Sequence, residues 1–243
     1  MGNLLPVKGK LLIAGPPKTN KSWIGLNMAL DLAKGKPLFG AYAKETKRPI
    51  FPVYQKCRVL FLEAEMGRSG TRDRLKQMLL PEQALGLDVY LKTRDVTLRM
   101  DTQEGKDAIE AEIATVRPDV CFADPMAKYH GVKEDSSEEM GRILRFTDYL
   151  IEKYNLSWVW THHTTKPSVE NPRQGGDRIR GSSAIFGDMD SIILVNRKSA
   201  NDNPEPVLEL TFELRRSEPM RAKYLKRHRS GLVTYEGDSA SGT

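Results

Sequence analysis

The chain has 243 residues, of which 39% are hydrophobic and 29% charged, and this balance excludes collagen-like, mucin-like and wholly disordered proteins. Lysine and arginine outnumber aspartate and glutamate by six, which hints at a polyanionic partner without identifying one. The excess is local, because the window from Arg215 to Arg229 holds seven basic residues and one acidic residue and so carries the whole +6.

Cysteine usage and hydropathy restrict the class of protein further. Cys57 and Cys121 lie in unrelated contexts without the spacing of zinc ligands, which favours a reduced compartment. No apolar stretch approaches the ~18–20 residues of a membrane span, and the N-terminus lacks a signal-peptide pattern. We therefore expect a cytoplasmic protein without a membrane partner.

Apolar runs of strand length alternate with helical patterns through most of the chain. In chain order the pattern predicts a strand at 11–14, a helix at 21–33, a loop at 40–56, a strand at 59–62, a helix at 69–80, a strand at 88–92, a helix at 104–116, a strand at 119–123, a helix at 136–154 and a strand at 157–161. This alternation indicates βαβ units in an α/β fold, with a mostly parallel twisted sheet and helices on both faces.

The pattern changes after residue 190. Four further strands are predicted at 191–195, 207–214, 221–225 and 231–235, and none of the connections is long enough for a crossover helix. An antiparallel C-terminal edge on the parallel sheet is the natural arrangement. We expect one domain over residues 1–236 and a flexible tail over residues 237–243.

The first strand leads into a phosphate-binding loop. Its sequence is close to Gly-x-x-x-x-Gly-Lys-Ser/Thr and lies between a strand and a helix, as that motif requires. Backbone N–H groups would bind the phosphates of ATP, Lys21 would reach the β- and γ-phosphates, and Ser22 would ligate Mg²⁺. The expected ATP-binding residues are Gly15, Pro16, Pro17, Lys18, Thr19, Asn20, Lys21, Ser22 and Trp23.

One position departs from the motif, because Asn20 stands where the second glycine belongs. Asparagine tolerates the left-handed backbone region better than other non-glycine residues, so we expect the loop to keep its shape, at some risk to ATP affinity. The alternative is a strand-to-helix turn, rich in lysine and proline, that binds no ligand.

Acidic and polar residues follow three of the predicted strands, at the end of a parallel sheet where ligands bind. Glu65 is a better candidate than Glu63 for a general base that orients water, although a helix-capping acid or a surface ion pair is the alternative. Asp124 ends an apolar strand in the form of a Walker B aspartate, a ligand for Mg²⁺. His162 and His163 alternate faces, so one of them could sense the γ-phosphate while the pair could not share a metal.

The combination of motifs resembles the RepA-like branch of RecA-like ATPases, which includes hexameric replicative helicases. The segments that carry the resemblance are Gly-Pro-Pro-Lys-x-x-Lys-Ser, Leu-Glu-Ala-Glu, Ala-Asp-Pro-Met-Ala-Lys, Glu-Met-Gly-Arg, Thr-His-His-Thr and Arg-Gly-Ser-Ser-Ala at 180–184. The resemblance spans about residues 5–235 and implies a RecA-like core, ATP and Mg²⁺ as ligands, and a homo-oligomer, expected to be a hexameric ring.

The resemblance also implies roles for individual residues. Lys21 and Ser22 match the family's phosphate and Mg²⁺ positions, Glu65 its catalytic glutamate, Asp124 its Walker B aspartate and His163 its sensor. The segment Arg-His-Arg-Ser-Gly matches a basic pair that reaches the γ-phosphate of the neighbouring subunit. The residues of that pair are Arg227 and Arg229.

Alternatives for the basic window are a protected edge strand and nucleic-acid contact. Two loops, 128–137 and 164–182, are candidates for contact with single-stranded DNA, with a flexible surface loop as the alternative. Their basic residues are Lys128, Lys133, Lys166, Arg173, Arg178 and Arg180. The second loop has no aromatic residue, so only backbone contact with DNA is expected there.

The sequence therefore predicts an ATP-hydrolysing motor of the hexameric helicase or translocase type, acting on single-stranded DNA in replication. A nucleotide-binding regulatory or recombinase-like ATPase with slow turnover and no unwinding is the alternative, motivated by Asn20. A small-molecule kinase is a weaker third hypothesis, since no acceptor-binding lid can be identified.

Overall fold

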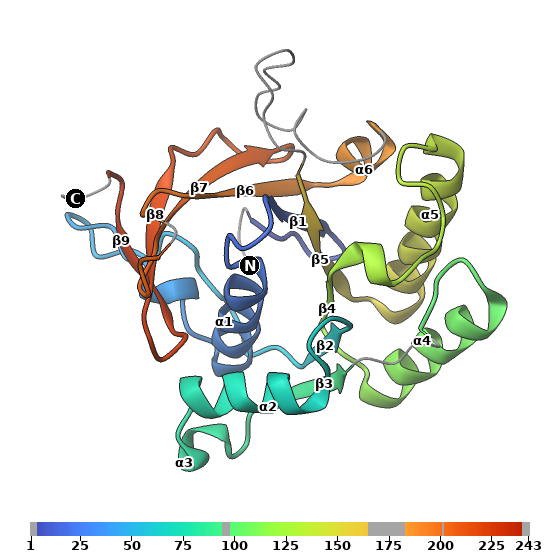
Figure 1. Cartoon of the computed structure of the whole chain (residues 1–243), viewed down its shortest axis with the longest axis horizontal. Coiled ribbons are helices and arrows are strands. Elements are labelled where there is room, and N and C mark those ends of the chain that lie inside the picture. Colours follow the sequence, from blue (N-terminus) through green and yellow to red (C-terminus); the bar gives the residue numbers. More distant parts are fainter. Residues whose placement is uncertain (1–3, 94–97, 165–182, 201, 240–243) are drawn as a thin grey trace.

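The computed structural model describes residues 4–93, 98–164, 183–200 and 202–239, and these form a nine-stranded mixed sheet (Figure 1). The strand order is β3-β2-β4-β5-β1-β6-β7-β8-β9. The strands are β1 (Lys10–Gly15), β2 (Val59–Glu63), β3 (Val89–Thr93), β4 (Val120–Asp124), β5 (Ser157–His163), β6 (Ser191–Arg197), β7 (Val207–Leu214), β8 (Lys223–Arg227) and β9 (Val233–Gly237). The predicted α/β fold with a mostly parallel sheet is confirmed.

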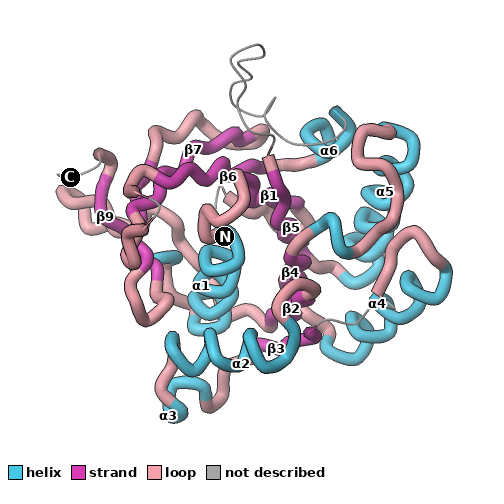
Figure 2. The backbone as a smooth tube through the Cα atoms, in the orientation of Figure 1, coloured by secondary structure: helices cyan, strands magenta, loops and turns pink. Residues whose placement is uncertain are grey.

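Four long helices lie where the sequence predicts them, and Figure 2 shows how they flank the sheet. The short helices were not predicted, because three to six residues are too few to show a helical period. The α-helices are α1 (Lys21–Lys34), α2 (Gly67–Met78), α3 (Pro81–Ala84), α4 (Gln103–Val116), α5 (Ser137–Tyr154) and α6 (Ser183–Asp188), and the 3-10 helices are η1 (Leu38–Gly40) and η2 (Met126–Lys128). The helices among the described residues are too short or too polar to span a membrane.

Alternation along the buried strands produces a hydrophobic core on each face of the sheet. In β1, Leu11 and Ile13 pack into the core that includes α1 and α2. Leu12 and Ala14 point the other way, into the core that α4 and α5 cover. Because successive side chains of a strand face opposite sides, one run of small and branched apolar residues supplies both cores.

The C-terminal strands form the predicted antiparallel edge. β6 pairs in parallel with β1, whereas β7 and β8 continue the sheet by antiparallel pairing and β9 ends it. β8 and β9 each lie two residues later than predicted, since pairing with β7 begins at Lys223 and Arg221 stays exposed. Gly237, expected to begin the tail, pairs with Tyr224 as the last residue of β9.

Polar contacts hold both ends of β1. At its start, the buried Lys10 ammonium forms ion pairs of 2.5 Å with Asp148 of α5 and 2.5 Å with Asp188 of α6. At its end, the Gly15 carbonyl accepts a hydrogen bond of 3.1 Å from the backbone N–H of Thr164, which follows β5. β1 is thereby attached to elements on either side of residues 165–182.

Candidate active site

The loop between β1 and α1 has the backbone of an anion-binding turn. Lys18 and Asn20 adopt positive φ angles of 64° and 66°, and α1 begins directly after Asn20. The Asn20 side chain makes no capping hydrogen bond, and no acidic residue lies in the first turn of α1. The helix therefore presents its N–H groups and the positive end of its dipole at the loop. Asn20 takes the left-handed conformation that the sequence predicts for this position.

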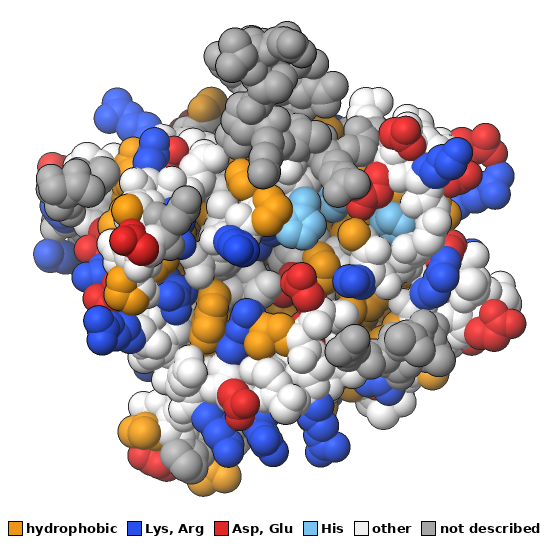
Figure 3. Space-filling model, viewed as in Figure 1, with side chains coloured by type: hydrophobic (Ala, Val, Ile, Leu, Met, Phe, Trp, Pro, Cys, Tyr) orange, Lys and Arg blue, Asp and Glu red, His pale blue; other side chains and the backbone are white. Residues whose placement is uncertain are grey.

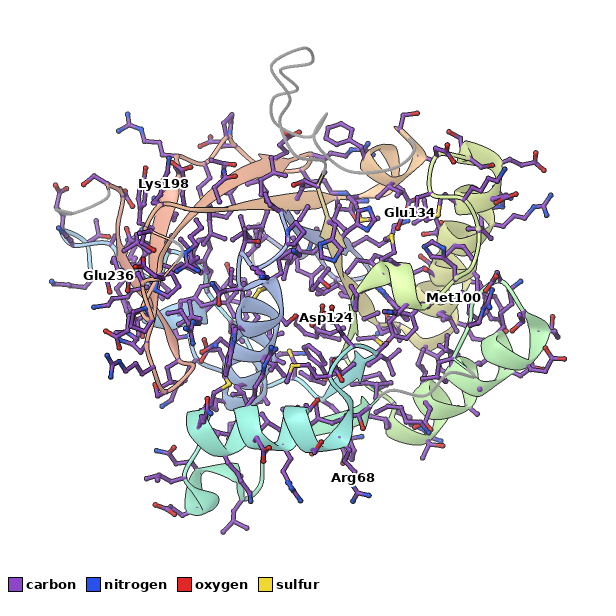
Figure 4. The ribbon with its side chains drawn as sticks, viewed as in Figure 1. Arg68, Met100, Asp124, Glu134, Lys198 and Glu236 are labelled. Carbon is purple, nitrogen blue, oxygen red and sulfur yellow. The ribbon has the colours of Figure 1, made fainter. Side chains whose placement is uncertain are left out.

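A pocket of about 480 Å³ opens in front of this loop. Figure 3 shows acidic, basic and histidine side chains gathered near the centre of the same face. Figure 4 shows Asp124 at this centre, whereas Arg68, at the start of α2, lies away from it near the lower edge of the view. The pocket is lined by Pro17, Lys18, Thr19, Asn20, Lys21, Ser22, Trp23, Glu65, Met66, Arg74, Asp124, Pro125 and His163. Residues from the β1–α1 loop, the end of β2, α2, the end of β4 and the end of β5 therefore meet at one cavity.

Lys21 is the buried cation of the pocket. Its ammonium donates hydrogen bonds of 2.9 Å to the carbonyl oxygens of Gly15 and Pro16 and lies 3.3 Å from Nδ1 of His163. Burial lowers the pKa of Lys21 to about 8, against the opposing attraction of Asp124 and Glu65. The side chain is thus held where an anion in the pocket would meet it.

Asp124 ends β4 and is almost completely buried. Its carboxylate accepts hydrogen bonds from the hydroxyl groups of Thr161 and Ser22. Burial raises the pKa of Asp124, with the negative charges of Glu63 and Glu65 adding to the increase, and the two hydrogen bonds oppose it. A cation beside Asp124 and Ser22 would relieve this burial cost, and their oxygens are the ligand type that Mg²⁺ prefers.

The two glutamates after β2 differ in their surroundings. The buried Glu63 carboxylate accepts backbone N–H bonds from Glu65 (2.9 Å), Met66 (2.6 Å) and Gly67 (3.0 Å) and a hydroxyl bond from Thr71 (3.2 Å). It therefore satisfies the N-terminus of α2. Glu65 is exposed at the pocket, and its carboxylate makes no hydrogen bond or ion pair within the described part of the chain.

The adjacent histidines of β5 face different surroundings, as strand alternation requires. His162 is buried, whereas the half-buried His163 lines the pocket and is paired with Gly15 of β1. Burial lowers the pKa of His163, and the nearby Lys21 charge lowers it further. An ammonium can only donate, so a neutral His163 accepts through Nδ1 and keeps its Nε2 proton available for donation.

Arg74 is a pocket residue that was not predicted from the sequence. It projects from α2 into the pocket, where its guanidinium lies 4.7 Å from the centre of the Trp23 ring and is attracted by Asp124, Glu63 and Glu65. The spacing of residues 67, 71, 74 and 78 places them on one face of α2, and the other three positions are buried. This helical spacing could have predicted that Arg74 faces inward. An arginine on the inner face of a helix that begins beside the pocket needs a partner there.

The remaining predicted residues lie around or beyond the pocket. Arg227 lies 5.5 Å from the centre of the Trp23 ring in the same chain and donates to the Pro204 carbonyl (2.6 Å), while Arg229 is exposed in the turn between β8 and β9. Lys128 and Lys133 are exposed after β4. Lys166, Arg173, Arg178 and Arg180 lie outside the described residues.

Comparisons with known proteins found one matching family and a protein of similar structure. The model of a family described as the AAA domain matches residues 1–169. A KaiC-like protein from the hyperthermophilic archaeon Pyrococcus horikoshii OT3 has a similar structure, with a TM-score of 0.60 and 10% sequence identity, over 96% of this chain and 91% of that chain. No curated protein matches the chain in sequence. The structural likeness confirms that the predicted core is RecA-like.

Proposed function

The chain belongs to the AAA domain family, and from that membership we propose that it is an ATP-hydrolysing motor of the hexameric helicase or translocase type that acts on single-stranded DNA. The observation that carries the proposal is the convergence of Lys21, Glu65, Asp124 and His163 on one pocket at the carboxyl ends of parallel strands. Each supplies a different part of phosphoryl transfer to water.

Hydrolysis follows from the positions of these groups. The loop N–H groups and the Lys21 ammonium bind the phosphates of ATP, and the exposed Glu65 carboxylate accepts a proton from the attacking water and orients it. His163 donates a hydrogen bond to phosphate through Nε2, and Arg74 contributes positive charge where negative charge develops. Mg²⁺, when bound, would neutralise phosphate oxygens, held by Ser22 and Asp124.

The low pKa of Lys21 leads to a pH dependence of ATP binding. Phosphate binds the charged ammonium, so affinity is highest below the pKa of about 8 and falls as the pH rises through it. We expect the Kd of a fluorescent ATP analogue to rise about tenfold between about pH 7.5 and about pH 9. The Lys21→Met variant should bind weakly with no such slope, and equal wild-type affinity at both pH values would contradict the assignment.

A ring would bring a second set of cations to the pocket. The exposed Arg229, with Arg227 beside it, fits a group that stabilises the γ-phosphate charge in the adjacent subunit, an effect worth about 10³–10⁵ in rate in related systems. Support comes from the place of Arg229 in a tight turn at the edge of the sheet, where β9 pairs only with β8 among the described strands.

Contact with DNA is proposed for the segments that follow β4 and β5. These strands are neighbours and parallel, so both segments begin side by side at the pocket end of the sheet. Lys128 and Lys133 offer phosphate contacts, while Glu134 and Asp135 balance their charge locally. Binding through the backbone of single-stranded DNA is therefore expected to be salt-dependent and tolerant of sequence.

The test is ATP hydrolysis with and without single-stranded DNA. We expect a stimulation of about tenfold or more by an oligonucleotide at low salt, decreasing at higher salt because phosphate contacts release counterions. Solution mass measured with ATP and Mg²⁺ should show a ring. No stimulation together with no DNA binding at low salt would contradict a DNA motor.

Asn20 in the phosphate loop favours one other candidate, a regulatory or recombinase-like ATPase with slow turnover. A side chain at this position adds bulk next to the phosphates, where the motif has glycine. Tight ATP binding with negligible hydrolysis in every oligomeric state, with or without DNA, would support this second candidate.

A further inference from the structure

A buried asparagine joins the phosphate-loop helix to the turn between β8 and β9. The Asn27 amide donates to the carbonyl oxygens of Trp23 (2.8 Å) and Gly231 (3.0 Å), and its side-chain oxygen accepts from the N–H of Val233 (3.0 Å). Asn27 is 5% exposed and lies on α1, two helical turns after the start of the helix at Lys21. A single side chain thus connects segments more than 200 residues apart in the sequence.

The same turn packs tightly on Trp23. Gly231 has a φ of 81°, and a Cβ atom there would lie 2.1 Å from Cζ3 of the Trp23 ring, so no larger residue fits without a shift. Arg227 covers the ring as well, at 5.5 Å from its centre. Both polar and apolar contacts therefore fix the turn against the residue that directly follows Ser22 in the phosphate loop.

The turn carries Arg229 as a closed unit. His228 and Gly231 are joined by a backbone hydrogen bond of 2.9 Å, and His228 N–H donates to the Leu232 carbonyl at 2.8 Å. The backbone N–H of Arg229 donates to the Glu205 carboxylate at 3.0 Å, and the Arg229 residue is exposed. Moving the start of α1 would therefore move the base of the turn that presents Arg229.

We propose that Asn27 is a positioning residue that sets the orientation of Arg229 toward the neighbouring subunit according to the state of its own phosphate loop. Through this contact, ATP binding in one subunit adjusts the cation that completes the next subunit's site. Asparagine suits the task because one amide both donates to Gly231 and accepts from Val233. The inference rests on the proposed ring. In such a ring, the pocket of each subunit faces one neighbour, and the turn between β8 and β9 faces the pocket of the other neighbour.

Subunit mixing tests the inference. Three variants are prepared for ATP-hydrolysis assays: Glu65→Gln loses the base of its own pocket but still binds ATP, Arg229→Ala loses its turn cation, and Asn27→Leu loses the amide. In an equal mixture of two variants, about a quarter of the interfaces join a sound pocket to a sound turn when the defects lie on opposite sides of the interface. Activity should therefore return when Asn27→Leu is mixed with Glu65→Gln, and should stay low when it is mixed with Arg229→Ala.

Two further variants keep the test decisive. Asn27→Asp keeps the size and the acceptor for Val233 but replaces the donor to Gly231, so it should show the same mixing pattern even if Asn27→Leu does not fold. Thr234→Val removes a hydrogen bond of 2.7 Å to His228 within the same hairpin without touching α1, and it should hydrolyse ATP within about twofold of wild type.

Each other outcome has a distinct meaning. If the Asn27 variants regain activity with Arg229→Ala but not with Glu65→Gln, Asn27 serves its own pocket and the inference is overturned. If Glu65→Gln and Arg229→Ala fail to complement each other, the ring with a shared site is wrong, and the inference is overturned with it. Wild-type hydrolysis by both Asn27 variants alone would overturn the inference while leaving the ring intact.

Discussion

Replacing Glu65 by glutamine is expected to lower the rate of ATP hydrolysis by about 10²–10⁴-fold, the usual contribution of a general base. Glutamine keeps the size of the side chain and loses the charge that accepts a proton from water. The Glu65 side chain is exposed at the pocket, so neither the fold nor the phosphate loop depends on it. Phosphate release measured at saturating ATP and Mg²⁺ gives the rate directly.

ATP binding is the control for this substitution. The Kd of a fluorescent ATP analogue should stay within about threefold of wild type. The reason is that ATP is bound by the N–H groups of the phosphate loop and by Lys21, which the substitution leaves in place. A Glu65→Gln protein that hydrolyses ATP at the wild-type rate would refute Glu65 as the base. A large loss of both binding and folding would show that the carboxylate is structural.

Replacing Glu63 by alanine is expected to lower the free energy of unfolding by about 2–4 kcal/mol, since it leaves buried donors without an acceptor. The donors are the N–H groups of Glu65, Met66 and Gly67 and the Thr71 hydroxyl. At about 2–4 °C per kcal/mol for a chain of this size, Tm should fall by about 5–15 °C. Urea unfolding followed by circular dichroism measures the change.

Glu65→Ala provides the matched control, two residues along the same segment. Its free energy of unfolding should change by less than about 0.5 kcal/mol, because the side chain is exposed. Similar stability losses for the two alanine variants would contradict the division between a structural and a chemical carboxylate. The two predictions together distinguish the roles of Glu63 and Glu65, whereas the sequence alone only favoured Glu65 over Glu63 as the general base.

Sequence periodicity predicted most of the fold because the buried strands and long helices carry strong apolar patterns. The convergence of Lys21, Asp124 and His163 was also predictable, since parallel strands place their carboxyl ends at one edge of the sheet. Strand order was not predicted, because pairing partners depend on contacts that local pattern does not encode. The two-residue displacement of β8 and β9 has the same origin, since pairing with β7 determines where β8 begins and pairing with β8 determines where β9 begins.

The contacts of two polar residues could not be predicted from the sequence. Asn27 is the one polar residue in the buried run from Ile24 to Leu30 of α1, and its partners Gly231 and Val233 come from the far end of the chain. Arg74 lies in a strongly charged helix, where one inward arginine among outward ones is easily overlooked. Both roles depend on tertiary proximity, so only the folded chain displays them.

The attachments of β1 have a mechanical consequence. The N–H of Thr164 donates to the carbonyl oxygen of Gly15 at one end of this strand, and Asp188 forms an ion pair with Lys10 at the other end. Gly15 also begins the phosphate loop. A displacement of Thr164 or of Asp188 would therefore act directly on β1, the six-residue strand whose last residue begins the phosphate loop.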